Sequence, residues 1–342
     1  MHIESIREKL KSHEYGFLTE NPHLGNNIIL LCVGGSHAYG LDTETSDIDI
    51  RGCALNQKSE ILYTDNFEQF VETETDTIIY SFNKLISLLC NCNPNTIELL
   101  GLRQEHYLYL HPIGQELLNK RKLFLSKRAI NSFSGYANDQ LRRLENISVR
   151  HVSQERTEEH ILHSIQNAMN SFASRYSSVP EDSIKLYTDK AINPNFDSEI
   201  FMDINLSHYP LRGYKDMWSE MNSIVKSYNK LGKRNSYARE HNKLGKHMAH
   251  LIRLYMMCID ILEKEEIVTY RNDEHDLLMD IRFGKYLTND SQPIPEFYDI
   301  LHDYECRLET AKKNTNLPKN PDYVAIKEFV MDVNERIVKG EI

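Results

Sequence analysis

The sequence predicts an α+β protein, in which an N-terminal part with a sheet and helices is followed by a mostly helical part that contains a small inserted β-hairpin. Three observations favour this fold class. Strand patterns occupy 28–55 and 67–80, and helical periodicity dominates from about residue 101. Two strand-like pieces, 185–188 and 200–204, interrupt the helices between prolines.

Size and composition agree with a soluble globular protein. The chain has 342 residues, of which 40% are hydrophobic and 26% are charged. This length can bury a large core and predicts two domains, which we expect over 1–110 and 111–342. The N-terminus lacks the apolar core of a signal peptide, and no run of about 18 apolar residues is present. We therefore expect a cytoplasmic protein.

Charge and cysteine usage narrow the function classes. The net charge of −10 excludes a protein that binds duplex nucleic acid through its whole surface. The six cysteines include no CxxC pair, so neither a zinc ribbon nor a disulfide-linked partner is indicated. Between 226 and 253, however, eight Lys or Arg residues accompany a single acid, which makes this segment a candidate for binding phosphates.

The predicted sheet begins after a short polar helix over 3–14. An apolar strand over 28–33 leads into the turn Gly34-Gly35-Ser36. Glycine lets the backbone of this turn approach a ligand, and Ser36 can cap a following helical turn. Because the N–H groups at a helix start suit a phosphate, the turn is a candidate phosphate site.

The second predicted strand carries Asp47 and Asp49. Successive strand side chains point to opposite faces, so both aspartates share one face with Arg51, which either pairs with Asp49 or reaches a phosphate. Two carboxylates on one face can hold a divalent cation. A phosphate turn beside them is what metal-assisted nucleotidyl transfer needs, and a plain acidic hairpin is the alternative.

These residues carry a family resemblance. Gly35-Ser36, followed by Asp47-Ile48-Asp49 eleven positions after the serine, resembles the signature of the DNA polymerase β-like nucleotidyltransferase superfamily. The longer string GSHAYGLDTETSDIDIRG is similar to the YcgL-type branch of predicted nucleotidyltransferases, which is related to the RNA-repair-associated RlaP proteins.

The resemblance extends to 241–263, 277–286 and 314–318 and weakens over 145–210. It implies a polymerase β-like domain with a mixed sheet, and a helical domain that closes over nucleotide and acceptor. The implied reaction moves a nucleoside monophosphate from a nucleoside triphosphate, with ATP expected, to an acceptor hydroxyl at an RNA 3′ end. Mg²⁺ or Mn²⁺ is the implied cofactor. AMP transfer to a protein hydroxyl and a non-catalytic nucleotide-binding module are the alternatives.

A third carboxylate is expected from 67–80, where the alternation of apolar and acidic residues fits one strand or a pair of strands. In a single strand, Glu72, Glu74 and Asp76 would share a face. By resemblance the third acid lies just ahead of an Ile-Tyr strand end, which selects Asp76. A register error of two residues would make it Glu74.

The resemblance also implies roles for the acids and the turn. Asp47, Asp49 and Asp76 would hold the metal ions. The backbone around Gly35, with Ser36, would hold the β- and γ-phosphates.

Three more groups on the strongest helical pattern in the second half of the chain are predicted to meet the nucleotide. Lys246, His250 and Arg253 fall at i, i+4 and i+7 on one helix face. An anion would relieve their mutual repulsion. The alternative is that His250 and Arg253 pair with acids such as Asp260 or Asp280 and join the helices.

Two further residues have two interpretations each. A break after 80–92 precedes a short helix, which Asn95 or Thr96 is expected to cap. Glu98 in that helix is either a partner of the helix dipole or part of the site. His37 either belongs to the phosphate turn or faces solvent at a helix start. Further helices are predicted over 111–119, 126–144 and 151–176.

Overall fold

The computed structural model describes residues 3–44, 46–149, 184–190, 192, 198–219, 222, 244–288 and 293–342. The chain forms two compact units. The first comprises Met1–Asn138, Ala249–Lys285 and Pro295–Ile342, and the second comprises Asp139–Met248 and Tyr286–Ile294. Two of the boundaries between the units fall inside long helices, α8 (Arg128–Val149) and α11 (Leu244–Lys264). The domain division at residue 110 stays a prediction.

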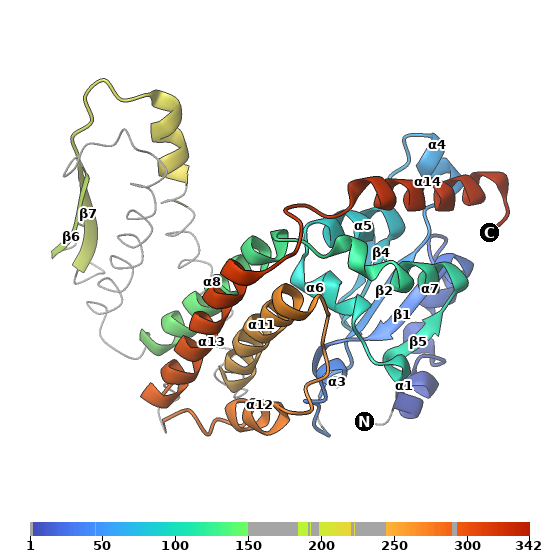
Figure 1. The fold of residues 1–342 in the computed structure, drawn as a ribbon, viewed down its shortest axis with the longest axis horizontal. Coiled ribbons are helices and arrows are strands. Elements are labelled where there is room, and N and C mark those ends of the chain that lie inside the picture. The colour runs from blue at the N-terminus through green and yellow to red at the C-terminus, as the bar shows by residue number, and fades with distance from the viewer. Residues whose placement is uncertain are drawn as a thin grey trace. The chain divides into compact units, whose positions relative to one another are not determined.

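A five-stranded mixed sheet lies at the centre of the first unit, in the order β3-β4-β2-β1-β5 (Figure 1). Its strands are β1 (Ile28–Val33), β2 (Ile50–Ala54), β3 (Gln69–Glu72), β4 (Thr77–Ser81) and β5 (Tyr107–Leu110). The β2–β4 pair is parallel, and the other neighbouring pairs are antiparallel. In the second unit, an antiparallel hairpin is formed by β6 (Ile184–Lys190) and β7 (Ser198–Ile204). The predicted α+β class, with its mixed sheet and inserted hairpin, is confirmed.

Helices surround the sheet largely where helical patterns predicted them. The helix predicted over 151–176 lies outside the described residues. The helices of the first unit that do not cross its boundaries are α1 (Ile3–Lys9), α2 (Phe17–Glu20), α3 (Gly35–Tyr39), α4 (Lys58–Leu62), α5 (Phe82–Cys90), α6 (Pro94–Ile97), α7 (Pro112–Asn119), α12 (His275–Arg282), α13 (Pro295–Asn314) and α14 (Tyr323–Lys339), with the 3-10 turn η3 (Glu98–Leu100) after α6.

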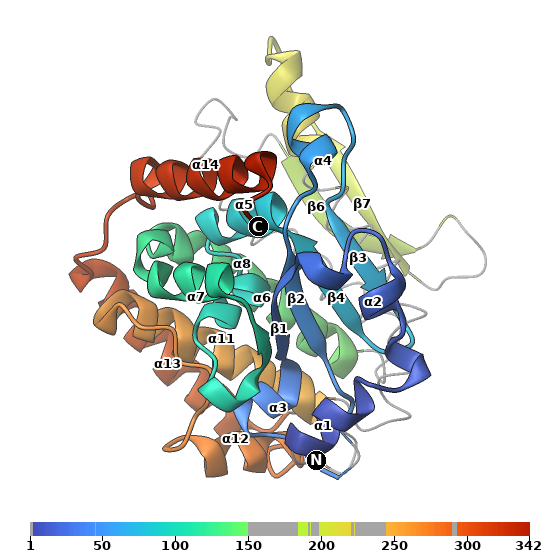
Figure 2. The same ribbon diagram turned by 90° about the vertical axis from the view of Figure 1, so that its right-hand side faces the viewer.

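The two faces of the sheet have different partners. Helices α1 and α2 cover one face, where Ile6 and Leu18 pack in a core cluster with Ile50 and Ile79 (Figure 2). Strand side chains alternate between faces, so Arg51 points to the opposite face, against which α5 and α7 pack. The predicted site residues of β2 are therefore on the α5–α7 face.

Two local expectations are wrong. Tyr107–Leu110 forms a strand, although the pattern favoured helix from about residue 101, because four residues show no clear period and pairing with β1 decides their conformation. Helix α6 is capped by Asn93, whose Oδ1 accepts a hydrogen bond from the Asn95 N–H at 3.0 Å, and not by Asn95 or Thr96. Pro94 in the first turn fixes this start.

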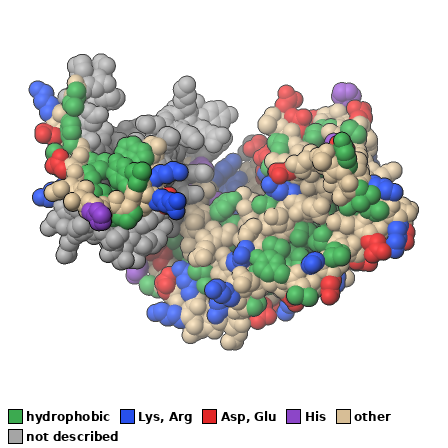
Figure 3. Space-filling view, turned by 90° about the horizontal axis from the view of Figure 1, so that it is seen from above, with side chains coloured by type: hydrophobic (Ala, Val, Ile, Leu, Met, Phe, Trp, Pro, Cys, Tyr) green, Lys and Arg blue, Asp and Glu red, His purple; other side chains and the backbone are tan. Residues whose placement is uncertain are grey.

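The surface drawn in Figure 3 interleaves Lys and Arg side chains with Asp and Glu side chains over the part of the chain that the structure describes. This view therefore offers no continuous basic patch among the described residues. No helix in the described ranges is both long and apolar enough to cross a membrane.

Candidate active site

The glycine turn connects β1 to α3 and packs directly against Asp49. The Gly34 N–H donates a hydrogen bond to the Asp49 carbonyl oxygen at 2.8 Å. Gly35 has a φ of +56°, and a Cβ at this position would lie 1.6 Å from Asp49 Oδ2. Only glycine combines this backbone conformation with so close an approach. The turn thus holds the carboxylate at a fixed distance from the start of α3.

Ser36 does not cap this helix, contrary to the sequence expectation. Helix α3 begins at Gly35, and its N-cap is Gly34, which makes no side-chain cap hydrogen bond. Ser36 is instead the second residue of the helix, where its backbone N–H is among the first-turn donors. The phosphate-binding potential of the turn therefore comes from backbone N–H groups and the helix start.

The aspartate pair lies just before β2, which begins at Ile50 and not at Asp47 as the pattern predicted. The alternation of buried and more exposed side chains nevertheless continues over the residues that precede the strand. Ile48 and Ile50 are buried, Asp49 is half-buried and Asp47 is exposed. The hydrogen bond from Gly34 keeps this segment extended without continuing the regular strand pairing. Asp49 is therefore the inner acid of the pair and Asp47 the outer one.

Asp76 is brought beside Asp49 by the parallel pairing of β2 with β4. Ile50 pairs with Thr77, so the residues immediately before the two strands lie at the same edge of the sheet. The Ile50 N–H also donates to the Asp76 carbonyl oxygen at 3.2 Å. This juxtaposition joins two segments that are separate in the sequence.

The hairpin between β3 and β4 corrects the prediction that three acids share a strand face. Residues 73–76 form a turn, in which Asp76 has a φ of +44°. Glu74 is exposed in this turn, and its N–H donates to Glu72 Oε1 at 3.3 Å. Of the two candidates for a third carboxylate, the structure brings Asp76 to Asp49.

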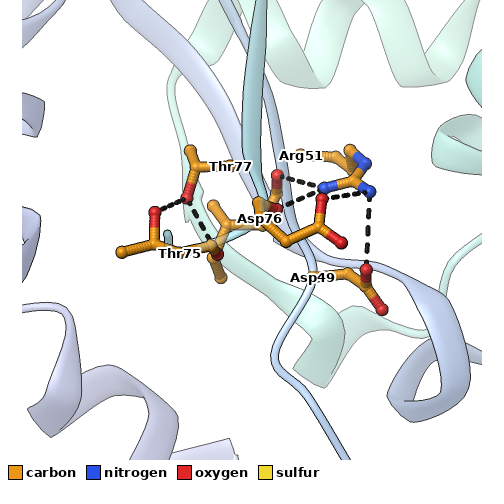
Figure 4. Close-up of polar contacts among 6 residues, drawn as sticks. Asp49, Arg51, Thr75, Asp76 and Thr77 are labelled. Carbon is orange, nitrogen blue, oxygen red and sulfur yellow. Dashed lines mark hydrogen bonds and ion pairs between the residues drawn. The ribbon is translucent and has the colours of Figure 1, made fainter. Parts of the chain in front are cut away.

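Arg51 joins the two acids (Figure 4). Its Nη2 lies 3.0 Å from Asp76 Oδ1 and 3.4 Å from Asp49 Oδ1, and its Nη1 donates to the Asp76 carbonyl oxygen at 2.5 Å. Of the two predicted roles for Arg51, the structure contains the pairing with Asp49. The guanidinium supplies positive charge at the point where the two carboxylates would repel each other.

The electrostatics of Asp49 are those of a carboxyl group in a crowded acidic site. Burial, a hydrogen bond with Asp76 and the charges of Asp76 and Asp47 raise the pKa of Asp49 to about 7, although Arg51 opposes the shift. A cation bound to the carboxylates would reverse this penalty, and carboxylate oxygens are ligands that Mg²⁺ accepts. By this test Asp49 and Asp76 fit a divalent cation.

The side chains of the site do not by themselves form a complete set of metal ligands among the described residues. Among the described residues, no group of three or more His, Cys, Asp or Glu side chains is arranged to hold a metal ion. Asp47 contributes its charge to Asp49, and its place in the ligand set stays a prediction.

The raised pKa of Asp49 predicts a pH-dependent stability. Between its ordinary value of 3.8 and about 7, folded Asp49 binds a proton that the unfolded chain releases, so the free energy of unfolding should fall as the pH rises through this window. Burial raises the pKa of Glu98 to about 7 as well, and it acts in the same direction. Urea unfolding in the presence of a chelator measures this slope. Asp49→Asn should reduce it, and an unchanged slope would contradict the raised pKa.

Two buried threonines brace the turn that presents Asp76 (Figure 4). Thr75 Oγ1 and Thr77 Oγ1 are 2.8 Å apart and hydrogen-bonded, and both residues are buried. The pair spans Asp76 and holds the chain on each side of its positive φ. Sequence reasoning missed this brace, although the flanking of Asp76 by two threonines is its visible signal.

We expect Thr77→Val to destabilise the turn. The substitution keeps the shape of the side chain but leaves the Thr75 hydroxyl buried without its partner, at a cost of about 1–3 kcal/mol. The double variant Thr75→Val/Thr77→Val should be closer to wild type, because neither hydroxyl is then left unpaired. Thermal or urea unfolding of wild type, Thr75→Val, Thr77→Val and the double variant tests this order. A double variant that loses the sum of both single losses would show that the brace does not act as a pair.

Of the three basic groups predicted on one face of α11, only part lies near the acidic site formed by Asp49 and Asp76. Arg253 stacks on the Tyr39 ring, with its guanidinium carbon 3.0 Å from the ring centroid, and its Nη2 lies 3.2 Å from His250 Nδ1. Burial lowers the pKa of Arg253 to about 10, and the charge of Asp49 is among the smaller effects that oppose this shift. Arg253 is thus near the acidic site, and Tyr39, which stacks under it, was missed by sequence reasoning.

The two acids that were predicted as alternative partners of His250 and Arg253 form ion pairs with other residues. Asp260 pairs with Arg271 and with Lys264, and Asp280 pairs with Lys285. Lys246 is exposed on α11 and belongs to the second unit, so its role toward the nucleotide stays a prediction.

His37 is buried and does not face solvent. It lies in α3, and its Nδ1 is 3.2 Å from Asp42 Oδ2. Burial lowers the pKa of this histidine. A neutral imidazole fixed by a carboxylate is a packing element of α3, one residue after Ser36 in the phosphate turn.

Comparison with known proteins gives a family match. A family model described as RlaP, the RNA repair pathway DNA polymerase beta family, matches residues 3–187. This range includes the glycine turn, all three predicted acids, Arg51 and Glu98. No curated protein and no solved structure matches the chain.

Proposed function

The chain belongs to the RlaP family, the RNA repair pathway DNA polymerase beta family, and on this premise we propose that it transfers a nucleoside monophosphate from a nucleoside triphosphate to an RNA 3′ hydroxyl. ATP is the expected donor. The observation that carries the proposal is that Asp49 and Asp76, which immediately precede two neighbouring parallel strands, are both paired with Arg51 beside a glycine turn at a helix start.

In the proposed reaction the acceptor oxygen attacks the α-phosphate. A bond forms between this oxygen and the α-phosphorus, the bond from the α-phosphorus to the β-phosphate oxygen breaks, and pyrophosphate leaves with that electron pair. The proton of the hydroxyl passes to a carboxylate of the site. In this step the protein would mainly position the reactants and stabilise the negative charge on the phosphates.

Each group of the site would have a part in this step. Asp49 and Asp76, with Asp47, would hold Mg²⁺ or Mn²⁺, which when bound lowers the pKa of an acceptor hydroxyl and neutralises phosphate charge. The first-turn N–H groups of α3, at Gly35 and Ser36, would hold the terminal phosphates.

The basic groups would complete the nucleotide site. Arg51, which now pairs with both acids, would be free to contact a phosphate once a cation takes its place. His250 and Arg253 of the first unit would approach the triphosphate.

A labelling experiment tests the proposal. The protein is incubated with α-labelled or γ-labelled nucleoside triphosphates, Mg²⁺ or Mn²⁺, and separate pools of RNA and protein. Label that moves from the α position into RNA, and not from the γ position, supports the proposed reaction. Label in protein would identify AMP transfer to a protein hydroxyl, and metal-dependent binding without transfer would identify a non-catalytic module. Either of these outcomes would overturn the RNA assignment.

A further inference from the structure

Four cations of the first unit form a local cluster without an acidic partner. They come from the two segments 122–128 and 318–323, and they are the exposed Lys122, Lys127 and Lys319 and the half-buried Arg128. In the part of the chain that the structure describes, none of the four forms an ion pair. Several exposed lysines elsewhere in this unit do pair with acids, as Lys339 does with Glu335 at 2.6 Å. The protein therefore leaves the positive charge of this cation cluster without a counter-charge of its own.

Backbone pairing brings the two segments together. The Lys127 N–H donates to the Pro318 carbonyl oxygen at 2.8 Å, and the Asp322 N–H donates to the Leu123 carbonyl oxygen at 2.9 Å. Asp322 is the single acid in either segment, and its Oδ1 accepts a hydrogen bond from the Ala325 N–H at 3.0 Å as the N-cap of α14. The cations thus lie side by side because the fold joins two distant stretches, and the acid between them has a structural role.

Arg128 is held in place by neutral groups. Its Nη1 donates to Asn91 Oδ1 at 2.7 Å, and its Nε donates to Asn320 Oδ1 at 3.3 Å. Its guanidinium carbon lies 5.7 Å from the centroid of the Tyr323 ring, and Tyr323 is 45% exposed. Amide oxygens and an aromatic ring orient the guanidinium without a negative charge, so its own charge is available to an anion.

Helix stability does not explain the two cations at the start of α8. Lys127 immediately precedes this helix, Arg128 is its first residue, and its first turn contains no acid. Cations are disfavoured at this end of a helix, because the helix dipole places positive partial charge there. A bound phosphate group would neutralise both the side chains and the helix start.

The cluster lies at the ends of the two helices that pack on the face of the sheet that carries Arg51. Helix α5 is followed directly by Asn91, which holds Arg128. One residue after α7, the 3-10 turn η5 (Arg121–Phe124) begins, and it contains Lys122. The cation cluster therefore belongs to the same unit, and to the same layer of helices, as the acidic site.

We propose that this cluster binds single-stranded RNA and so holds the acceptor strand whose 3′ end is extended. The identity of the strand rests on the proposed function. Phosphates would lie along the three lysines and Arg128, and a base would stack on the exposed Tyr323 ring. Four cations beside one ring fit a few nucleotides of a single strand, because a duplex presents its phosphates without a free base face.

RNA binding in the presence of a chelator tests this surface without requiring transfer. The fluorescence anisotropy of a labelled single-stranded RNA of about twelve nucleotides gives the dissociation constant at several salt concentrations. The triple variant Lys122→Gln/Lys127→Gln/Lys319→Gln removes exposed charges, so the protein should stay folded. It should bind RNA at least about tenfold more weakly, and the slope of log K against log[salt] should become shallower by about 2, since each phosphate contact to a single strand contributes about 0.7.

The matched control removes three charges from lysines that do have acidic partners. Lys11, Lys84 and Lys339 each pair with a glutamate, at 2.7, 2.9 and 2.6 Å. The variant Lys11→Gln/Lys84→Gln/Lys339→Gln has the same net charge as the first triple variant and should keep the wild-type affinity and salt slope. Equal losses in the two triple variants would mean that net charge alone attracts RNA, and would overturn the proposal.

Tyr323 distinguishes single-stranded RNA from other polyanions. Tyr323→Leu should weaken binding of the single strand roughly tenfold through the loss of stacking, whereas Tyr323→Phe should bind as wild type does. Duplex RNA and vesicles that contain phosphatidylserine are measured in parallel. If either of these binds through the cluster as tightly as the single strand and Tyr323→Leu changes nothing, the partner is a different polyanion and the proposal is wrong.

Transfer measurements separate this proposal from the proposed function. The triple variant of the cluster should raise the KM for RNA and leave kcat near the wild-type value, because its three lysines do not touch the reacting atoms. If wild type binds RNA through the cluster but no α-label reaches RNA, the proposed function fails and the RNA surface stands. If label reaches RNA and the triple variant binds and transfers as wild type does, the RNA surface is wrong and the proposed function stands.

Discussion

Asp49→Asn should abolish nucleotidyl transfer while leaving a folded protein. Asp49 is the inner acid of the site, in contact with Asp76 and closely packed against Gly35. Loss of its charge should reduce kcat/KM on the order of 10³-fold or more, as removal of a group that acts on the reacting centre does. Steady-state transfer of α-label into RNA measures this loss.

Stability separates a catalytic loss from a folding loss. The amide that replaces the carboxylate in this variant is neutral, so the cost of burying a charge, which is the main cause of the raised pKa of Asp49, disappears together with the repulsion by Asp76 and Asp47. At neutral pH the variant should melt at the same temperature as wild type or higher. A melting temperature well below wild type would mean that lost activity cannot be assigned to the carboxylate.

Glu74→Gln is the matched control for this experiment. It removes one negative charge from the exposed turn that also presents Asp76, two residues away. Transfer should stay near the wild-type rate, because Glu74 is turned to solvent and only Asp76 reaches Asp49. Equal losses in Glu74→Gln and Asp49→Asn would show that the third acid is Glu74 and that the assignment of Asp76 is wrong.

Gly35→Ala should reduce nucleotidyl transfer almost as much as Asp49→Asn does. A methyl group there would overlap Asp49 Oδ2 at 1.6 Å, so either the carboxylate or the turn must move. The φ of +56° costs an alanine about 1–2 kcal/mol in addition. We expect a lower melting temperature and a transfer rate reduced by at least about a hundredfold, because small displacements of reacting groups have effects of this size.

Gly135→Ala provides the opposite case. Gly135 lies within α8, and a Cβ there would meet no atom of the described residues within 4 Å. Alanine should stabilise this helix by about 0.5–1 kcal/mol and leave transfer unchanged. Gly35→Ala should therefore lose both stability and transfer, whereas Gly135→Ala should gain stability and keep the wild-type transfer rate. A Gly35→Ala protein with wild-type stability and activity would contradict the close packing of the turn on Asp49.

Local patterns predicted the elements that a short stretch of sequence can specify. The apolar run of β1, Gly35 in its turn and the spacing from Ser36 to Asp49 all lie within one continuous segment, and each has a local physical signal. The first acids and the glycine turn were therefore identified from sequence. The predicted strand bounds differ from those observed, because Asp47 and Asp49 keep the alternation of a strand without its pairing.

The third acid shows where local reasoning ends. An alternating acidic stretch fits one strand or two, and only the turn at 73–76 makes Glu74 and Asp76 differ. The resemblance selected Asp76, but its contact with Asp49 exists because β2 and β4 are parallel with Ile50 opposite Thr77. A pairing between distant strands leaves no trace in either strand alone.

The sequence by itself determined the fold class, the glycine turn and the pair of acids that follows it, because each depends on neighbours along the chain. Tertiary structure decided which acid joins Asp49, that Arg51 bridges them, and that Arg253 stacks on Tyr39. These contacts join residues from β2, the β3–β4 turn, α3 and α11. The physical reason is that burial and charge are properties of the folded surroundings, and a residue acquires them only when distant segments pack around it.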